Sequence, residues 1–336
     1  MNLADRWHSL ILGNAVDMMR YDAGLRDEIN AMIKALGKDL VREIISADLD
    51  TPRTDWQRAR LRTLLKEAQT RIQEAYTEVA NVHSSGLAAA VDANTTGLVL
   101  AMNEAAGVQL LDAVKWSPNL LKALVDGTLI NGAPSADWWA RQSVDLQNAF
   151  NDQMRQGIMR GEGVAPLVAR VKPLLETSTR NAEALVRTSA MAVNNAAQLA
   201  TYKENADVLQ SLQWCATLDP RTCLSCGAQD GEQWAPSETE HITPPLHWNC
   251  RCVVVPISRL WEELGIDPPP GTRASWEGPV DKNTTWESWL KGLPAADQKE
   301  ILGPARQKLW DAGKLSITDL VDQRGNALTL EQLVGK

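Results

Sequence analysis

The chain has 336 residues, of which 44% are hydrophobic and 23% are charged, and its formal net charge is −8. This balance is typical of a globular protein with two domains, or with one large domain and an extension. We find no apolar run of membrane-span length and no signal peptide at the N-terminus, so we expect function in the cytoplasm and no membrane association. The acidic balance argues against nonspecific duplex binding, which needs a basic face, although a local basic strip would be compatible with it.

Apolar residues of the N-terminal region recur every three or four positions, a spacing that predicts amphipathic helices. One apolar stripe runs from Ile29 to Ile44, and a second, the clearest in the chain, runs from Leu61 to Val79. Two long helices in succession usually pack as a hairpin. The small and polar stretch 86–107 predicts a loop or a break between helices.

Further helices, separated by short turns, are predicted in the middle of the chain. Ser135 is the expected N-cap of the first of them, and glycines near residue 161 are expected to end it. A short helix is predicted over 164–175, and Thr177 or Ser178 is expected to open another one.

The hydrophobic period changes at Leu212, where apolar and polar residues begin to alternate as they do in a strand. Asp219-Pro220 predicts a turn after this strand. A second short strand is expected at Val253–Val255, closed by Pro256. The segment between the two strands contains all of the cysteines except one.

The C-terminal part is predicted to begin with a proline-rich linker at Asp267–Gly271. Short helices are expected near 286–290, 298–312 and 328–333. Tryptophan is unusually frequent, with 13 Trp against one Phe, and most of these residues follow position 213. We interpret them as core residues of a small domain, since Trp is highly buried on average.

Five cysteines lie within one short segment, and their odd number in a reducing compartment argues against a disulfide framework. The spacing is C-x2-C, then 20 residues, then H-x2-C-x-C. A close pair followed by a distant pair is how tetrahedral zinc sites are usually assembled. The pattern predicts a structural zinc held by Cys223, Cys226 and Cys250, with either His247 or Cys252 as the fourth ligand.

Cys215 alternates with core positions on the predicted strand, so we do not expect it to bind the metal. Asp219, Asp230 and Arg251 are expected to form a buried polar network that orients the ligands. We find no glycine-rich phosphate loop, Ser/His/Asp set or pair of catalytic carboxylates, and therefore predict no catalytic residues.

The remaining histidines give weaker signals. His8 and His83 are isolated and are expected to be solvated. His241 is close in sequence to the predicted ligands, and we interpret it as a loop residue.

The segment from Asp219 to Cys226, the dipeptide Asp230-Gly231 and the run from His247 to Cys252 together resemble the phage Mu F-like family of head morphogenesis, or minor head, proteins. The upstream helix with Arg187-Thr188 and Asn194-Asn195 is similar too. The resemblance covers roughly residues 120–257.

This resemblance implies a minor capsid protein of low copy number in the virion, present in the host cytoplasm during assembly. It implies association with the portal protein and with the major capsid or scaffolding protein; in some relatives the protein accompanies the phage DNA into the host. The predicted fold is mainly α, with a long N-terminal helical hairpin and a small α+β C-terminal module whose short strands flank the Cys/His site. The expected domains are a helical region at 1–110, a Mu F-like domain at 111–257 with the Cys/His module at about 212–257, and an extension at 258–336.

Two other functions would be compatible with a Cys/His module. One is a zinc-supported nuclease of the HNH type, for which Glu240-His241 is the nearest approach to a catalytic pair, but Cys250 and Cys252 have the wrong spacing for it. The other is a DNA-binding zinc module without catalysis. We favour the structural role and expect no enzymatic activity.

Overall fold

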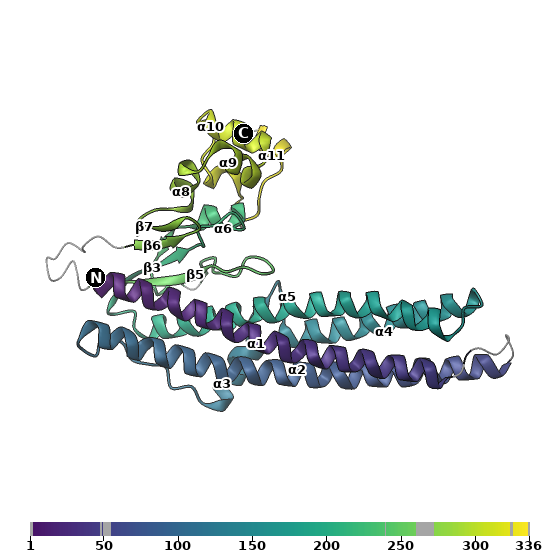
Figure 1. Ribbon diagram of the computed structural model, residues 1–336. Coiled ribbons are helices and arrows are strands. Elements are labelled where there is room, and N and C mark those ends of the chain that lie inside the picture. Colours follow the sequence, from purple (N-terminus) through teal and green to yellow (C-terminus); the bar gives the residue numbers. More distant parts are fainter. Residues whose placement is uncertain are drawn as a thin grey trace. The chain divides into compact units, whose positions relative to one another are not determined.

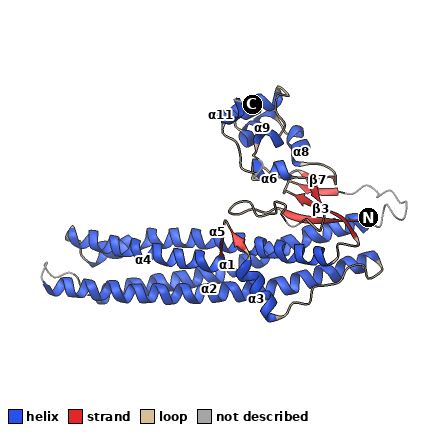
Figure 2. Cartoon of the chain, turned by 180° about the vertical axis from the view of Figure 1, so that it is seen from behind, coloured by secondary structure: helices blue, strands red, loops and turns tan. Residues whose placement is uncertain are grey.

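The computed structural model describes residues 3–47, 49, 55–238, 240–259, 272–322 and 325–334. The predicted fold class is confirmed: the chain is mainly helical, and its strands are few and short (Figure 2). No helix of the described ranges combines the length and the apolarity that a membrane crossing requires. The linker predicted at Asp267–Gly271 lies outside the described residues.

Long helices dominate the chain (Figure 1). The first two, α1 (Leu3–Ser46) and α2 (Asp55–Ala106), are antiparallel and form the predicted hairpin. The Trp7 indole near the start of α1 donates to the Met102 carbonyl near the end of α2, at 2.8 Å. Most residues of the two apolar stripes, from Ile29 to Ile44 and from Leu61 to Val79, are buried, and the others, such as Leu61, are half-buried. The period of the sequence therefore identified the packed faces correctly.

The loop or break predicted at 86–107 is wrong, because α2 continues to Ala106. The polar residues of this stretch find partners inside the helical core. Thr95 Oγ1 donates to the Val91 carbonyl at 2.7 Å, and Asn94 Nδ2 donates to Asn14 of α1 and to Asn194 at 2.9 and 2.8 Å. Satisfied in this way, polar side chains are compatible with a continuous helix.

The two helices predicted over 164–199 are a single helix, α5 (Val164–Glu204), which contains Pro173. Thr177, an expected helix start, instead donates its hydroxyl to the Pro173 carbonyl at 3.0 Å. This bond to the residue four positions earlier is common for Thr inside helices, so the hydroxyl caps no new helix.

The α4 helix (Ser135–Met159) follows the short helix α3 (Pro118–Gly127) and a hairpin of β1 (Leu129–Ile130) and β2 (Ala133–Pro134). Its N-cap is Pro134, without a side-chain cap, so the prediction of Ser135 as the N-cap is wrong. The helix ends before Gly161, whose φ of +74° is the left-handed conformation expected of a terminating glycine.

The cysteine segment lies between the strands of a three-stranded antiparallel sheet, whose order is β4–β3–β5. Its strands are β3 (Leu209–Cys215), β4 (Gln233–Trp234) and β5 (Val253–Ser258), and the six-residue helix α6 (Leu224–Gln229) lies between β3 and β4. The two predicted strands are confirmed in place, with shifted ends. Pro256 lies inside β5, opposite Leu212, and does not close the strand.

The C-terminal extension packs its tryptophans and leucines into one core. Trp286 and Leu290 are fully buried there, together with Leu218 and Ala228 from the cysteine segment. The helix expected at 298–312 is two helices, because Gly303 adopts a φ of +77° between them. The elements are β6 (Thr272–Ser275), β7 (Gly278–Asp281), α8 (Trp286–Gly292), α9 (Ala295–Leu302), α10 (Pro304–Asp311), η1 (Thr318–Leu320) and α11 (Leu330–Val334).

The chain forms two compact units. One combines the residues up to Met18 with Val91–Ser117 and the residues from Met191 onward, and it contains the sheet, the cysteine segment and the C-terminal extension. The other combines Met19–Ala90 with Pro118–Ala190 and is mainly helical. The long helices α1, α2 and α5 contribute residues to both.

Candidate metal centre

Cys223 and Cys226 are brought together by the start of α6. Cys223 is the N-cap of this helix, and its sulfur accepts a hydrogen bond from the Cys226 backbone N–H at 3.4 Å. The turn before it is fixed by Thr222, whose hydroxyl donates to the Thr217 carbonyl at 2.5 Å. The C-x2-C spacing thus folds into one helical turn that directs both sulfurs toward the same site.

The other donors come from the loop that precedes β5. A turn joins His247 and Cys250, closed by a 3.2 Å hydrogen bond from the Cys250 N–H to the His247 carbonyl. Asn249 adopts a φ of +63° in this turn, a left-handed conformation that Asn tolerates better than most residues. Cys252 directly precedes Val253, the first residue of β5, so its position is set by the sheet.

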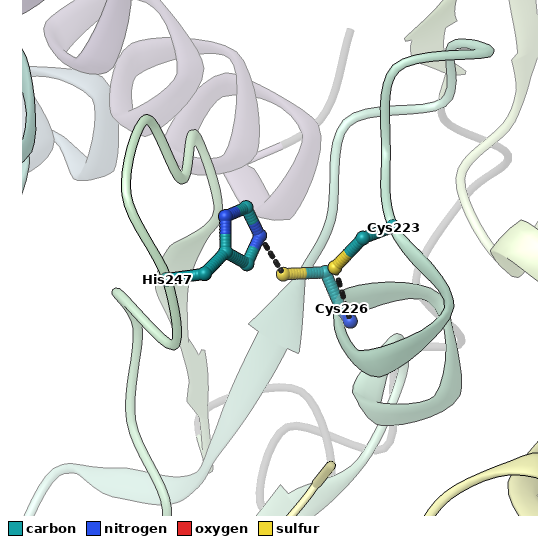
Figure 3. Close-up of side chains that lie close together, drawn as sticks. All are labelled: Cys223, Cys226 and His247. Atoms are coloured by element: carbon teal, nitrogen blue, oxygen red, sulfur yellow. Dashed lines mark hydrogen bonds between the residues drawn. The ribbon is translucent and has the colours of Figure 1, made fainter. Parts of the chain in front are cut away.

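These five side chains form two groups of donors that share Cys226. Cys223, Cys226 and His247 form one, and Cys226, Cys250 and Cys252 form the other; within each group the donor atoms lie within 4.8 Å of one another. Cys226 Sγ lies 3.3 Å from His247 Nε2 and 3.6 Å from Cys250 Sγ. Figure 3 shows the imidazole facing the Cys226 sulfur, with Cys223 beside it.

The separations fit a tetrahedral zinc ion. Zinc bonds of ~2.3 Å to sulfur and ~2.0 Å to nitrogen put two sulfurs ~3.8 Å apart, and a sulfur and a nitrogen ~3.5 Å apart. The observed contacts of Cys226 with Cys250 and His247, at 3.6 and 3.3 Å, are close to these values. The Nδ1 atom of His247 lies 2.8 Å from the Trp248 carbonyl. A hydrogen bond from Nδ1 there leaves the Nε2 lone pair available for a metal.

The electrostatics of the cluster also suit a cation. The hydrogen bond from the Cys226 thiol lowers the pKa of Cys223 to about 4, and His247 contributes in the same direction. Hydrogen bonds to the sulfurs of Cys223 and Cys250 raise the pKa of His247 to about 11. Hydrogen bonds with Cys223, Cys250 and Cys252 raise the pKa of Cys226, so without a metal the negative charge lies on Cys223 and Cys250, and the His247 imidazolium is the cation between them. A divalent metal would displace the protons of His247 and Cys226 and would bind neutral imidazole and thiolates.

The predicted polar network around the cluster is present as two separate ion pairs. In the first, Arg251 binds both carboxylate oxygens of Asp219, at 2.5 and 2.8 Å. Burial alone would raise the pKa of Asp219, but hydrogen bonds and charge from Arg251 outweigh burial and lower this pKa. The pair fixes the backbone between Cys250 and Cys252 against the turn that leads into α6.

The second pair joins Asp230 to Arg273 of β6, with an Nη2–Oδ1 distance of 2.8 Å. The Asp230 carboxylate also accepts from the backbone N–H groups of Ala216 and Trp286, each at 2.7 Å. Arg273 further donates to the Ala216 carbonyl. The sequence analysis did not identify Arg273. It lies 43 positions after Asp230, and an Arg at such a distance is expected to be exposed, since Arg is rarely buried unless it is paired.

A second missed residue is Asn195 of α5. Its amide donates to the Cys252 carbonyl at 3.1 Å and to the Pro244 carbonyl at 3.4 Å, and its side chain is buried. The Asn194-Asn195 pair was noticed only through the family resemblance. The Asn195 amide holds the loop that carries His247, Cys250 and Cys252 against α5.

The other residues considered in the sequence lie away from the cluster. His241 stacks on Trp234 with ring centroids 4.1 Å apart and lies 3.2 Å from Glu238. Cys215 belongs to neither donor group of the described residues, and burial raises the pKa of its thiol to about 11.

The prediction that His83 is solvated is wrong, because its side chain is fully buried and accepts a hydrogen bond from the Trp139 indole at 3.1 Å. His83 is buried against Trp139 of α4, which lies 56 positions away in the sequence. The residues next to His83 therefore could not predict its burial. The side chain of His8 lies outside the described residues.

Comparison with known proteins gives one family match. Residues 148–255 match the sequence model of the family described as phage Mu protein F like protein. The match begins within α4, includes the whole of α5 and ends within β5, so it contains all five donors. No curated protein and no solved structure matches the chain.

Proposed function

We propose that the chain is a structural minor head protein of a tailed bacteriophage that acts in head assembly at the portal. The observation that carries this proposal is the phage Mu protein F like match over residues 148–255, which supports a phage head morphogenesis protein. The mainly helical fold is compatible with a subunit whose function is to bind other proteins of the phage head. The proposed domains are a helical region at 1–110, a Mu F-like domain at 111–257 and a C-terminal extension at 258–336. The proposed partners are the portal and the major capsid or scaffolding protein. We also propose that the chain can pass into the host with the phage DNA.

Within this function, we propose that the Cys/His cluster binds one structural zinc ion through Cys223, Cys226, His247 and Cys250. The contacts of Cys226 with His247 and Cys250 support this set. Cys252 is then the fifth donor, whose thiol hydrogen-bonds to Cys250 and contributes to the lowered pKa of that neighbour. Four protein ligands leave no open position on the metal, so its role would be to stabilise the fold.

Metal analysis of the purified chain tests the zinc site. We expect about one zinc per chain, and loss of zinc with a large fall in stability in Cys226→Ser and Cys250→Ser. Cys215→Ser is the matched control and should retain the metal. Retention of zinc in Cys252→Ser but not in His247→Ala would support His247 as the fourth ligand; a fully stable chain without metal would contradict the site.

The role in the head is tested in the phage itself. An amber mutation in the reading frame should reduce the yield of DNA-filled heads, and cross-linking in wild-type virions should join this chain to the portal. Purified virions without any copy of the chain would contradict the proposal. A plasmid-nicking assay with magnesium tests the nuclease alternative, for which we expect no nicking.

A further inference from the structure

A groove lies between α1 and α5 in the mainly helical unit. It has a volume of about 1030 Å³ and is lined by residues between Ile33 and Val41 of α1 and between Val168 and Arg180 of α5. Gly37 contributes no side chain, and a Cβ atom at this position would come within 2.4 Å of Leu175. The floor is apolar and is formed by Ile33, Val41, Val168, Val171 and Leu175.

The rim of the groove is basic, unlike the chain as a whole. Lys34 and Lys38 border it on α1, and Lys172 and Arg180 border it on α5; all four side chains are exposed. The single acidic residue of the lining, Glu176, lies 3.9 Å from Lys172. A local excess of positive charge in a protein of net charge −8 gives this groove an electrostatic preference for an acidic ligand.

We propose that this groove binds an amphipathic helix of a partner protein, with an apolar stripe flanked by Asp and Glu. The part of α5 that lines the groove, from Val168 to Arg180, is about 18 Å long, which corresponds to roughly three turns of a docked helix. A helix seated between two helices buries its apolar stripe on the floor, and its acidic flanks reach the lysines. Apolar burial supplies the affinity, and the charges supply orientation and partner choice.

Nucleic acid fits the groove less well than an acidic helix. A phosphate backbone would pair with the basic rim but would leave the apolar floor without contacts. A membrane surface is also less suitable, because the apolar residues lie at the base of a groove between lysines rather than on a protruding face. The chemistry of the groove therefore favours a helix of another protein, and this inference does not depend on the proposed role in head assembly.

Binding of a synthetic helix to the full-length protein tests the proposal. The probe is a fluorescein-labelled peptide of about 18 residues, with Leu at helical spacing and Glu on both flanks; the control peptide carries Lys in place of every Glu. By fluorescence anisotropy, we expect the acidic peptide to bind at least about tenfold more tightly than the basic one, with weaker binding when NaCl rises from about 50 to about 300 mM.

Two charge-reversal variants locate the binding site. Lys34→Glu with Lys38→Glu should weaken binding of the acidic peptide about tenfold or more. Arg62→Glu with Lys66→Glu, the same change in charge at exposed positions of α2 outside the lining, should have little effect. Val41→Gln, which removes apolar surface from the floor, should weaken binding without changing its salt dependence. Circular dichroism verifies that each variant is folded.

Three outcomes would overturn the proposal. The first is equal binding of the acidic and basic peptides, and the second is equal loss of binding in both charge-reversal variants. The third is a different occupant: duplex DNA that competes with the peptide, or a dimer in light scattering that Lys34→Glu with Lys38→Glu dissociates, would assign the groove to nucleic acid or to a second copy of the chain.

Discussion

His83 is the buried histidine of the helical unit, and its environment keeps it neutral. Burial lowers its pKa from the ordinary value of 6.5 to about 3, while its Nδ1 atom accepts the hydrogen bond from the Trp139 indole. The ring also contacts Trp139 edge to face, with centroids 5.4 Å apart. The folded state therefore resists protonation of His83 in a pH range where the unfolded state does not.

This difference predicts acid sensitivity of the helical unit. The unfolded chain takes up a proton at His83 below pH ~6.5, but the folded chain does so only near pH 3, so the contribution of His83 to stability is complete above pH ~6.5 and falls as the pH decreases toward 3. The loss should reach at most about 1.4 kcal/mol per pH unit.

The free energy of unfolding of wild type and His83→Asn, measured from pH 7.5 to pH 4, checks this prediction. Asn retains an acceptor for the Trp139 indole but does not titrate in this range, so the difference between the two proteins isolates His83. Parallel curves would show that protonation of His83 has no part in acid unfolding.

At the residue scale, the sequence identified the five donors and the acidic and basic residues near them. It could do so because Cys and His at short spacing have few other uses in one segment. It could not identify Arg273 or Asn195, since each acts through a contact made only after distant elements pack. It also could not distinguish His247 from Cys252, because both lie beside Cys250 in the sequence.

At the scale of elements, the contact between α6 and α8 depends on the absence of a side chain at Gly227. A Cβ atom there would lie 2.3 Å from Trp286 Cε3, and Trp286 is fully buried. The indole therefore packs directly on the backbone of the helix that carries Cys226. This contact joins the core of the C-terminal extension to the cysteine segment.

We expect Gly227→Ala to destabilise this unit by about 1–3 kcal/mol, because the indole has to move within a packed core. Gly97→Ala is the matched control: Gly97 lies in α2 with nothing within 4 Å of its Cβ position, so this substitution should stabilise the helix by up to about 1 kcal/mol. Thermal unfolding of both variants provides the comparison. A Gly227→Ala protein as stable as wild type would mean that the indole is not tightly held.

Long periodic helices were the elements most readily predicted from the sequence. The apolar stripes of α1 and α2 repeat over many turns, and each turn adds to the same signal. The predicted interruptions at 86–107 and at Thr177 were wrong for a common reason. Asn94, Thr95 and Thr177 are typical of loops and caps, but here they donate hydrogen bonds within or between helices.

At the scale of the whole molecule, the Cys/His cluster and the C-terminal extension belong to one unit, and the segment that carries Cys223 and Cys226 shares a hydrophobic core with the extension. Leu218 and Ala228, on either side of the Cys223–Cys226 pair, are buried with Trp286 and Leu290. The loss of an ion that holds this pair would loosen both regions together. The helical unit has its own core and contains none of the donors.

Removal of the metal should therefore have a regional effect. After treatment with a chelator, amide hydrogen exchange should become faster in β3, β5 and α8, while Met19–Ala90 should keep its protection. Cys226→Ser should give the same pattern without chelator. Faster exchange confined to the helical unit, or none in the sheet, would argue against a metal that stabilises the fold.

The position of Asp230 has a consequence for where the polypeptide can be shortened. Its carboxylate has no exposed surface, and its counter-charge and one of its N–H donors come from Arg273 and Trp286. A chain that stopped at residue 258 would contain every sulfur and imidazole donor, yet the buried Asp230 carboxylate, at the end of the helix that carries Cys226, would lose its contacts with Arg273 and with the Trp286 N–H. The C-terminal extension thus stabilises the fold around the Cys/His cluster, although none of the five donors belongs to it.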